Sequence, residues 1–139
     1  MLEEKYYFDT SIWLDFLEKR DEPHMPKGEW ATRLIHKIAQ NNAQIVVSDV
    51  IKNEMVGLGY SKYEIEEIFS NLRKIITYVH STEKQFKRAR DLSKKRKIPL
   101  MDAFHALIAR DNKAIFITLD KHFREITDII KSFRPQDLI

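Results

Sequence analysis

The sequence predicts an α/β fold in which a parallel sheet lies between helices. Four short runs are apolar throughout instead of alternating with polar residues, which is typical of strands covered on both faces. Amphipathic stretches separate these runs, and parallel strands need such helical crossovers because a tight turn cannot join them. With 139 residues, 43% of them apolar, we expect residues 1–139 to form one domain with its own core.

The predicted strands are short and rich in Ile, Val, Tyr and Phe. They are Lys5–Phe8, Gln44–Val47, Ile75–Val79 and Ala114–Thr118, with a weaker fifth strand near Ile130–Arg134. The predicted helices are Ser11–Lys19, Trp30–Gln40, Asp49–Val56, Lys62–Leu72, Glu83–Lys95, Asp102–Asn112 and His122–Ile130. Two prolines and a glycine predict a surface loop over Asp21–Gly28.

The composition excludes several classes of protein. Without cysteine the chain has no disulfides, zinc fingers, iron–sulfur clusters or thiol nucleophiles. The three glycines form no glycine-rich loop of the kind that binds nucleotides. The start, MLEEKYY, lacks the basic and apolar segments of a secretory signal, and no apolar run reaches membrane-spanning length. We therefore expect a cytoplasmic protein, and the net charge of +3 mildly favours an anionic partner.

Four carboxylates follow apolar runs closely or stand at their ends: Asp9, Glu54, Asp102 and Asp120. Open α/β folds bind ligands at the carboxyl edge of the sheet, where such residues would meet. Two unit charges about 4 Å apart repel by roughly 4 kcal/mol at an effective dielectric constant of about 20, so converging acids require a cation. Oxygen ligands without cysteine favour Mg²⁺ or Mn²⁺, which can support phosphodiester hydrolysis by activating water and polarising a phosphoryl oxygen.

Each acid also has a simpler explanation. Asp9 and Asp120 could only cap the helices that follow them. Asp102 stands in the first turn of its helix, where the helix dipole favours an acid. Glu54 is harder to explain, because it lies within the apolar stripe of its helix, where an unpaired glutamate is rare. The four acids together are therefore more specific than any one of them.

Hydroxyl and basic residues accompany the acids. Ser11 could add a hydroxyl near Asp9, and Thr118 points to the same side of its strand as Asp120. His105 follows Asp102 by three residues and could assist the site or touch a phosphate, although such a histidine is more often structural. A basic block precedes Asp102, and its residues are Lys84, Lys87, Arg88, Arg90, Lys94, Lys95, Arg96 and Lys97. Such a block can be a solvated helix face or can hold a polyanion, and the candidate RNA contacts are Lys94, Lys95, Arg96, Lys97 and His105.

The chain resembles the PIN-domain family and, within it, the small VapC-type toxins. The resemblance spans nearly the full length and rests on FDTSIWLDFLE, VVSDVIKNEM, IPLMDAFHALIAR and IFITLDKHF. It implies a three-layer α/β/α sandwich with a central parallel sheet of four to five strands, and Mg²⁺- or Mn²⁺-dependent endoribonuclease activity. The implied metal-binding and catalytic acids are Asp9, Glu54, Asp102 and Asp120, with Ser11 and Thr118 as supporting hydroxyls. The implied partners are an RNA substrate, a small antitoxin protein and a second copy of the chain in a homodimer.

Three other functions stay open at this point. The chain could be a non-catalytic module that binds RNA or a protein partner and keeps the acids without turnover. It could be a phosphatase-like protein with Asp9 as nucleophile, although Ser11 stands where such enzymes commonly carry a second acid. It could also be a metal-independent ribonuclease that uses His105 and His122 as acid and base, which would leave the four acids unexplained.

Overall fold

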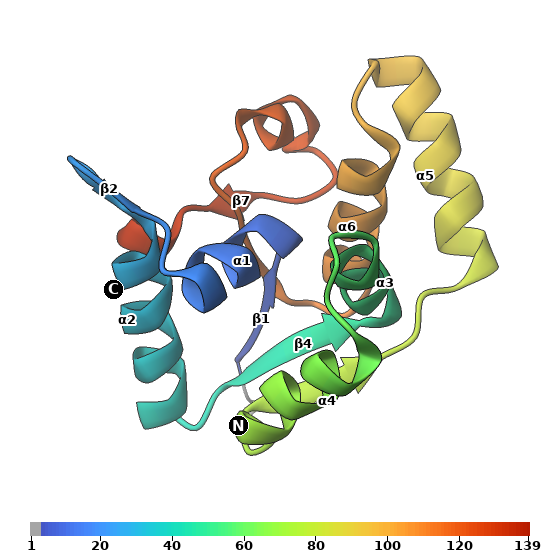
Figure 1. The fold of residues 1–139 in the computed structure, drawn as a ribbon. Coiled ribbons are helices and arrows are strands. Elements are labelled where there is room, and N and C mark those ends of the chain that lie inside the picture. The colour runs from blue at the N-terminus through green and yellow to red at the C-terminus, as the bar shows by residue number, and fades with distance from the viewer. Residues whose placement is uncertain (1–3) are drawn as a thin grey trace.

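The structure is a computed structural model that describes residues 4–139. Five parallel strands form the central sheet in the order β5-β4-β1-β6-β7 (Figure 1). Their bounds are β1 Lys5–Phe8, β4 Gln44–Ser48, β5 Ile76–Val79, β6 Ile115–Ile117 and β7 Ser132–Phe133. These strands confirm the four predicted runs and the weaker fifth one, with ends that differ by one or two residues.

Helices flank the sheet and complete the three-layer α/β/α sandwich (Figure 1). The helices are α1 Thr10–Glu18, α2 Lys27–Gln40, α3 Asp49–Gly57, α4 Lys62–Asn71, α5 Glu83–Arg96 and α6 Leu100–Asp111, with 3-10 helices η1 Lys121–Ile126 and η2 Pro135–Asp137. Helix α1 packs against α2, and α5 packs against α6. Among the described residues, none of the helices combines the length and the apolar character needed to cross a membrane.

Strand β1 lies at the centre of the sheet, and its side chains after Lys5 are buried on both faces. Tyr7 pairs with Val46 of β4 on one side and with Phe116 of β6 on the other. All three side chains are fully or almost fully buried, which explains why these strands are apolar without alternation. Because the strands are parallel, the chain segments that follow β1, β4 and β6 leave the sheet at the same edge.

Two predicted elements differ in the structure. The segment predicted as a loop holds a small antiparallel hairpin, β2 Asp21–Glu22 and β3 Met25–Pro26, and α2 begins directly after it at Lys27. A Cβ atom on Gly28 would lie 2.8 Å from the carbonyl oxygen of Asp15, so glycine is required where α2 approaches α1. The predicted helix His122–Ile130 is the shorter 3-10 helix η1, in which the buried Phe123 and Ile126 follow a period of three residues.

Two aspartates that helix periodicity places at the surface are partly or almost fully buried. Asp49 is half-buried and accepts hydrogen bonds from the backbone N–H of Ser81 at 2.6 Å and from its hydroxyl at 2.8 Å, which anchors the β5–α5 connection to α3. Asp15 is only 5% exposed. Burial raises the pKa of Asp15 to about 6, against the smaller effects of Lys27 and Arg20.

Asp15→Asn is expected to raise the free energy of unfolding at about pH 7.5 by about 1–2 kcal/mol. Folding raises the pKa of this carboxyl from 3.8 to about 6, so the folded state is penalised once the group ionises. The penalty is absent below about pH 4 and complete above about pH 6, and the gain should follow it. Urea denaturation at about pH 7.5 and at about pH 4 measures the gain. Asp91→Asn, an exposed site, serves as a control with the same change of charge. An equal gain at both pH values would contradict the assignment.

Candidate metal centre

The four predicted acids come together at the carboxyl edge of the sheet. Asp9 follows β1 directly, Asp120 follows β6 by three residues, and Glu54 and Asp102 are carried by α3 and α6. They line one small cavity of about 160 Å³, whose other lining residues are Thr10, Ser11 and His105. No lysine or arginine is among these lining residues, so the negative charge lacks a fixed cationic partner from such side chains.

Asp9 is held rigidly through both carboxylate oxygens. Its Oδ1 accepts hydrogen bonds from the backbone N–H of Ser11 at 2.8 Å and of Ile12 at 3.3 Å, which makes Asp9 the N-cap of α1. The hydroxyl of Ser11 also donates to Oδ1 at 2.5 Å, and the hydroxyl of Thr118 donates to Oδ2. Both predicted hydroxyls therefore contact Asp9, and capping and site formation are compatible roles of this residue.

Glu54 is oriented by two donors from other elements. Its Oε1 accepts a hydrogen bond from the hydroxyl of Thr10 at 2.8 Å and contacts Nε2 of His105. Burial alone would raise the pKa of Glu54, but the hydrogen bonds and charge of His105, together with the bond from Thr10, lower it on balance. In residues 4–139, Oε2 of Glu54 accepts no hydrogen bond and is left for a ligand.

A buried hydrogen-bonded chain supports this glutamate from behind. Nδ1 of His105 lies 2.7 Å from the hydroxyl of Tyr7, which in turn lies 2.8 Å from the hydroxyl of Ser48, the N-cap of α3. Burial raises the pKa of Tyr7 above its ordinary value, so its hydroxyl stays neutral and can donate. His105 is 3% exposed and both of its ring nitrogens are engaged. His105 thus supports Glu54, and its contact with RNA stays a prediction.

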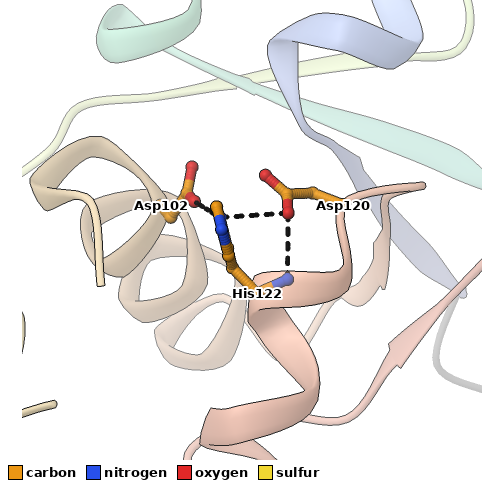
Figure 2. A group of neighbouring side chains, drawn as sticks. All are labelled: Asp102, Asp120 and His122. Atoms are coloured by element: carbon orange, nitrogen blue, oxygen red, sulfur yellow. Dashed lines mark hydrogen bonds and ion pairs between the residues drawn. The ribbon is translucent and has the colours of Figure 1, made fainter. Parts of the chain in front are cut away.

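His122 lies close to two of the four acids, Asp102 and Asp120 (Figure 2). Its Nδ1 lies 3.1 Å from Oδ1 of Asp120 and 3.4 Å from Oδ2 of Asp102, and its backbone N–H donates to Asp120 at 2.9 Å. The candidate ligand atoms of these three residues all lie within 4.8 Å of one another. Burial and the charges of Asp120 and Asp9 raise the pKa of Asp102, whereas His122 opposes the shift. The carboxylates of the site therefore repel the ionised form of Asp102.

The predicted basic block lies on α5 and just after it. Arg96 forms two hydrogen bonds with the carboxylate of Asp128, at 2.6 and 2.7 Å, so its charge is used inside the fold. Lys94, Lys95 and Lys97 are exposed and form no ion pair within residues 4–139. The surface that remains available for a polyanion is thus smaller than the sequence suggests.

The donor set of the cavity fits a hard divalent cation. Mg²⁺ and Mn²⁺ prefer carboxylate oxygens, and four acids supply them here without a competing ammonium or guanidinium group in the lining. Thr10 and Tyr7 were not predicted to belong to this site. His122 was considered only as an acid or base of a metal-independent ribonuclease, and its position beside the acids was not predicted. The position of His122, two residues after Asp120, was the one available signal in the sequence.

The fold is similar to that of several solved structures. VapBC-1 from nontypeable Haemophilus influenzae shares 21% sequence identity and a TM-score of 0.66, over 95% of this chain and 98% of that one. A toxin–antitoxin complex from Klebsiella pneumoniae shares 20% identity and a TM-score of 0.64, over 94% and 97%. FitAcB from Neisseria gonorrhoeae shares 16% identity and a TM-score of 0.60, over 96% and 99%. No curated protein matches the chain in sequence.

The sequence itself matches a family model over most of its length. The PIN domain model matches residues 6–129, a range that contains Asp9, Glu54, Asp102 and Asp120. The parallel five-stranded sheet between helices agrees with this match. The chain belongs to the PIN domain family.

Proposed function

We propose that the protein is a Mg²⁺- or Mn²⁺-dependent endoribonuclease and the toxin of a toxin–antitoxin pair. The observation that carries the nuclease proposal is the cavity shared by Asp9, Glu54, Asp102 and Asp120. Membership in the PIN domain family supports it. The structural neighbours, which are toxin–antitoxin complexes, support a small antitoxin as partner. We also propose that the protein forms a homodimer and is located in the cytoplasm.

Each acid has a distinct part in this mechanism. Asp9, Asp102 and Asp120 would hold the cation, which would lower the pKa of an attacking water and balance charge on the phosphoryl group. Glu54 would complete the metal cage or help to deprotonate the water: the lowered pKa keeps it ionised, so its free Oε2 can hold the cation or accept a proton. In-line attack would form a bond from the water oxygen to phosphorus and break the P–O3′ bond. The departing O3′ would take a proton from solvent, which leaves a 5′-phosphate and a 3′-hydroxyl.

The other functions considered for this sequence fit the geometry less well. His105 cannot serve as acid or base for a substrate, because it is buried and engaged through both nitrogens. An aspartyl nucleophile at Asp9 would have to attack through an oxygen that already accepts a hydrogen bond, because both Oδ1 and Oδ2 are engaged. A binding module without turnover keeps all the observed contacts, so it is the alternative that the first experiment must separate.

Wild-type protein incubated with end-labelled RNA is expected to yield defined fragments with Mn²⁺ and no product with excess chelator. The fragments should carry 5′-phosphates, which a 5′-phosphate-dependent exonuclease detects. Binding of the labelled RNA is measured in parallel by fluorescence anisotropy. Binding without product under both conditions would replace the nuclease by the binding module.

A further inference from the structure

A second cavity adjoins the candidate metal centre. It has a volume of about 370 Å³ and lies among η1, β7 and η2. Asp120 lines both cavities, and Thr118, which donates a hydrogen bond to Asp9, lines the second one. The two cavities therefore meet at Asp120, so a strand bound at the metal centre has this cavity beside it.

The lining of the second cavity carries an excess of positive charge. Four cationic side chains and two carboxylates line it, and the cationic ones are Lys121, Arg124, Lys131 and Arg134. Arg134 is neutralised by Asp137, at 2.8 and 3.0 Å. Within residues 4–139, Lys121, Arg124 and Lys131 form no ion pair, even though the carboxylate of Asp120 belongs to the same lining. Three positive charges thus remain available for an external anion.

The chemistry of this lining suits an anionic group such as a phosphate better than a base. The hydroxyls of Thr127 and Ser132 add hydrogen-bond donors beside the cations. No aromatic side chain is among the lining residues, so a base would find no surface for stacking. Lys131 is held with its Nζ 5.2 Å from the ring centroid of Phe133, which restricts its motion before any ligand arrives.

We propose that this cavity, the cationic subsite, binds a backbone phosphate of the RNA strand next to the phosphate that is cleaved. The inference rests on the ribonuclease function proposed above. Binding a neighbouring phosphate fixes the strand across the metal centre without reading its sequence. It also offsets the repulsion that the acids of the metal centre exert on the polyanion.

The test compares two double variants with equal changes of charge. Arg124→Gln/Lys131→Gln removes two cations of the subsite and leaves Lys121, which is adjacent to Asp120, in place. Arg33→Gln/Lys62→Gln removes two exposed cations of α2 and α4 that line neither the metal cavity nor the subsite. Circular dichroism and thermal unfolding establish that both variants are folded.

Binding of a fluorescein-labelled 12-nucleotide single-stranded RNA is measured by anisotropy with chelator present, over a series of salt concentrations. The subsite variant is expected to bind about tenfold more weakly than wild type. The slope of log K against log salt should become shallower by about 0.7, the contribution of one phosphate contact on a single strand. Equal affinity and equal slope in the subsite variant and the control variant would overturn the proposal.

Cleavage of RNAs that carry a single neutral methylphosphonate linkage locates the contact. In wild type, one linkage next to the cleaved bond should raise KM about tenfold, and in the subsite variant the same linkage should have no further effect. If every linkage affects the two proteins equally, the subsite is wrong although the nuclease stands. If wild type does not cleave the unmodified RNA with Mn²⁺, the nuclease proposal fails, and the binding measurement still decides whether the cavity holds phosphate.

Discussion

Asp102→Asn is expected to lower the rate of RNA cleavage by about a thousandfold or more, a loss of about 4 kcal/mol of transition-state stabilisation. The same substitution should raise the melting temperature of the metal-free protein by about 3 °C, equivalent to about 1 kcal/mol. Burial and the charges of Asp120 and Asp9 raise the pKa of Asp102, so its ionised form is destabilised in the folded state. The asparagine removes that charge and replaces one proposed carboxylate ligand by a neutral amide.

The stability gain has a defined pH dependence. Because the folded state raises the pKa of Asp102, the destabilisation is present at neutral pH and disappears as the pH falls below the ordinary carboxyl range. The gain from Asp102→Asn should disappear in parallel. Asp91→Asn, an exposed site on α5, is the control and should change neither cleavage nor stability. If Asp102→Asn cleaved RNA at the wild-type rate, Asp102 would not belong to the proposed active site.

Asp9 is expected to respond differently from Asp102. The Asp9 carboxylate caps α1 and accepts hydroxyl hydrogen bonds on both oxygens, so its charge is well stabilised where it stands. Asp9→Asn should therefore abolish cleavage without any gain in melting temperature. Asparagine still caps α1, but only one of its side-chain atoms accepts a hydrogen bond, so the loss of one hydroxyl bond offsets the relieved repulsion. The sequence alone does not reveal how many donors this carboxylate has.

His105→Leu is expected to lower the free energy of unfolding by about 2 kcal/mol, because Glu54 and Tyr7 each lose a buried hydrogen-bond partner. Cleavage should fall by about 10- to 100-fold, the usual cost of losing a residue that orients a metal ligand. The Mn²⁺ concentration needed for half-maximal activity should rise as well. Chemical denaturation and Mn²⁺-dependent kinetics measure the two effects separately.

Two polar variants distinguish positioning from mere packing at this site. The amide nitrogen of glutamine in His105→Gln can reach the place of Nε2 and donate to Glu54, so it should restore most of the Mn²⁺ affinity. The shorter His105→Asn can reach only the place of Nδ1, beside Tyr7, and should not restore it. Equal Mn²⁺ affinity in the leucine, asparagine and glutamine variants would show that His105 only fills space.

The fold was predictable because its strongest signals are local. The continuous apolar runs of β1, β4 and β6 reflect burial on both faces, and their parallel arrangement alone brings their ends to one edge. This geometry is enough to bring Asp9 and Asp120 close together. Glu54 could be predicted because a glutamate in an apolar helical stripe needs a partner. The 3-10 geometry of η1 was missed because a six-residue segment is too short to establish its period.

What the sequence could not predict depends on partners distant in the chain. Asp49 is hydrogen-bonded by Ser81, 32 residues away, and His105 is held by Tyr7, 98 residues away. Arg96, a predicted RNA contact, pairs with Asp128, 32 residues further on. No periodicity encodes such pairs, because the pairing arises only when the helices pack.

The central claim is that the four acids bind a divalent cation between them. Crystals of the wild-type protein soaked in Mn²⁺ test it most directly through anomalous diffraction. The account predicts an anomalous peak in the cavity within bonding distance of carboxylate oxygens of Asp9, Asp102 and Asp120, and no such peak in crystals of Asp102→Asn. An empty cavity at saturating Mn²⁺, or a peak bound elsewhere with the four acids unoccupied, would contradict it.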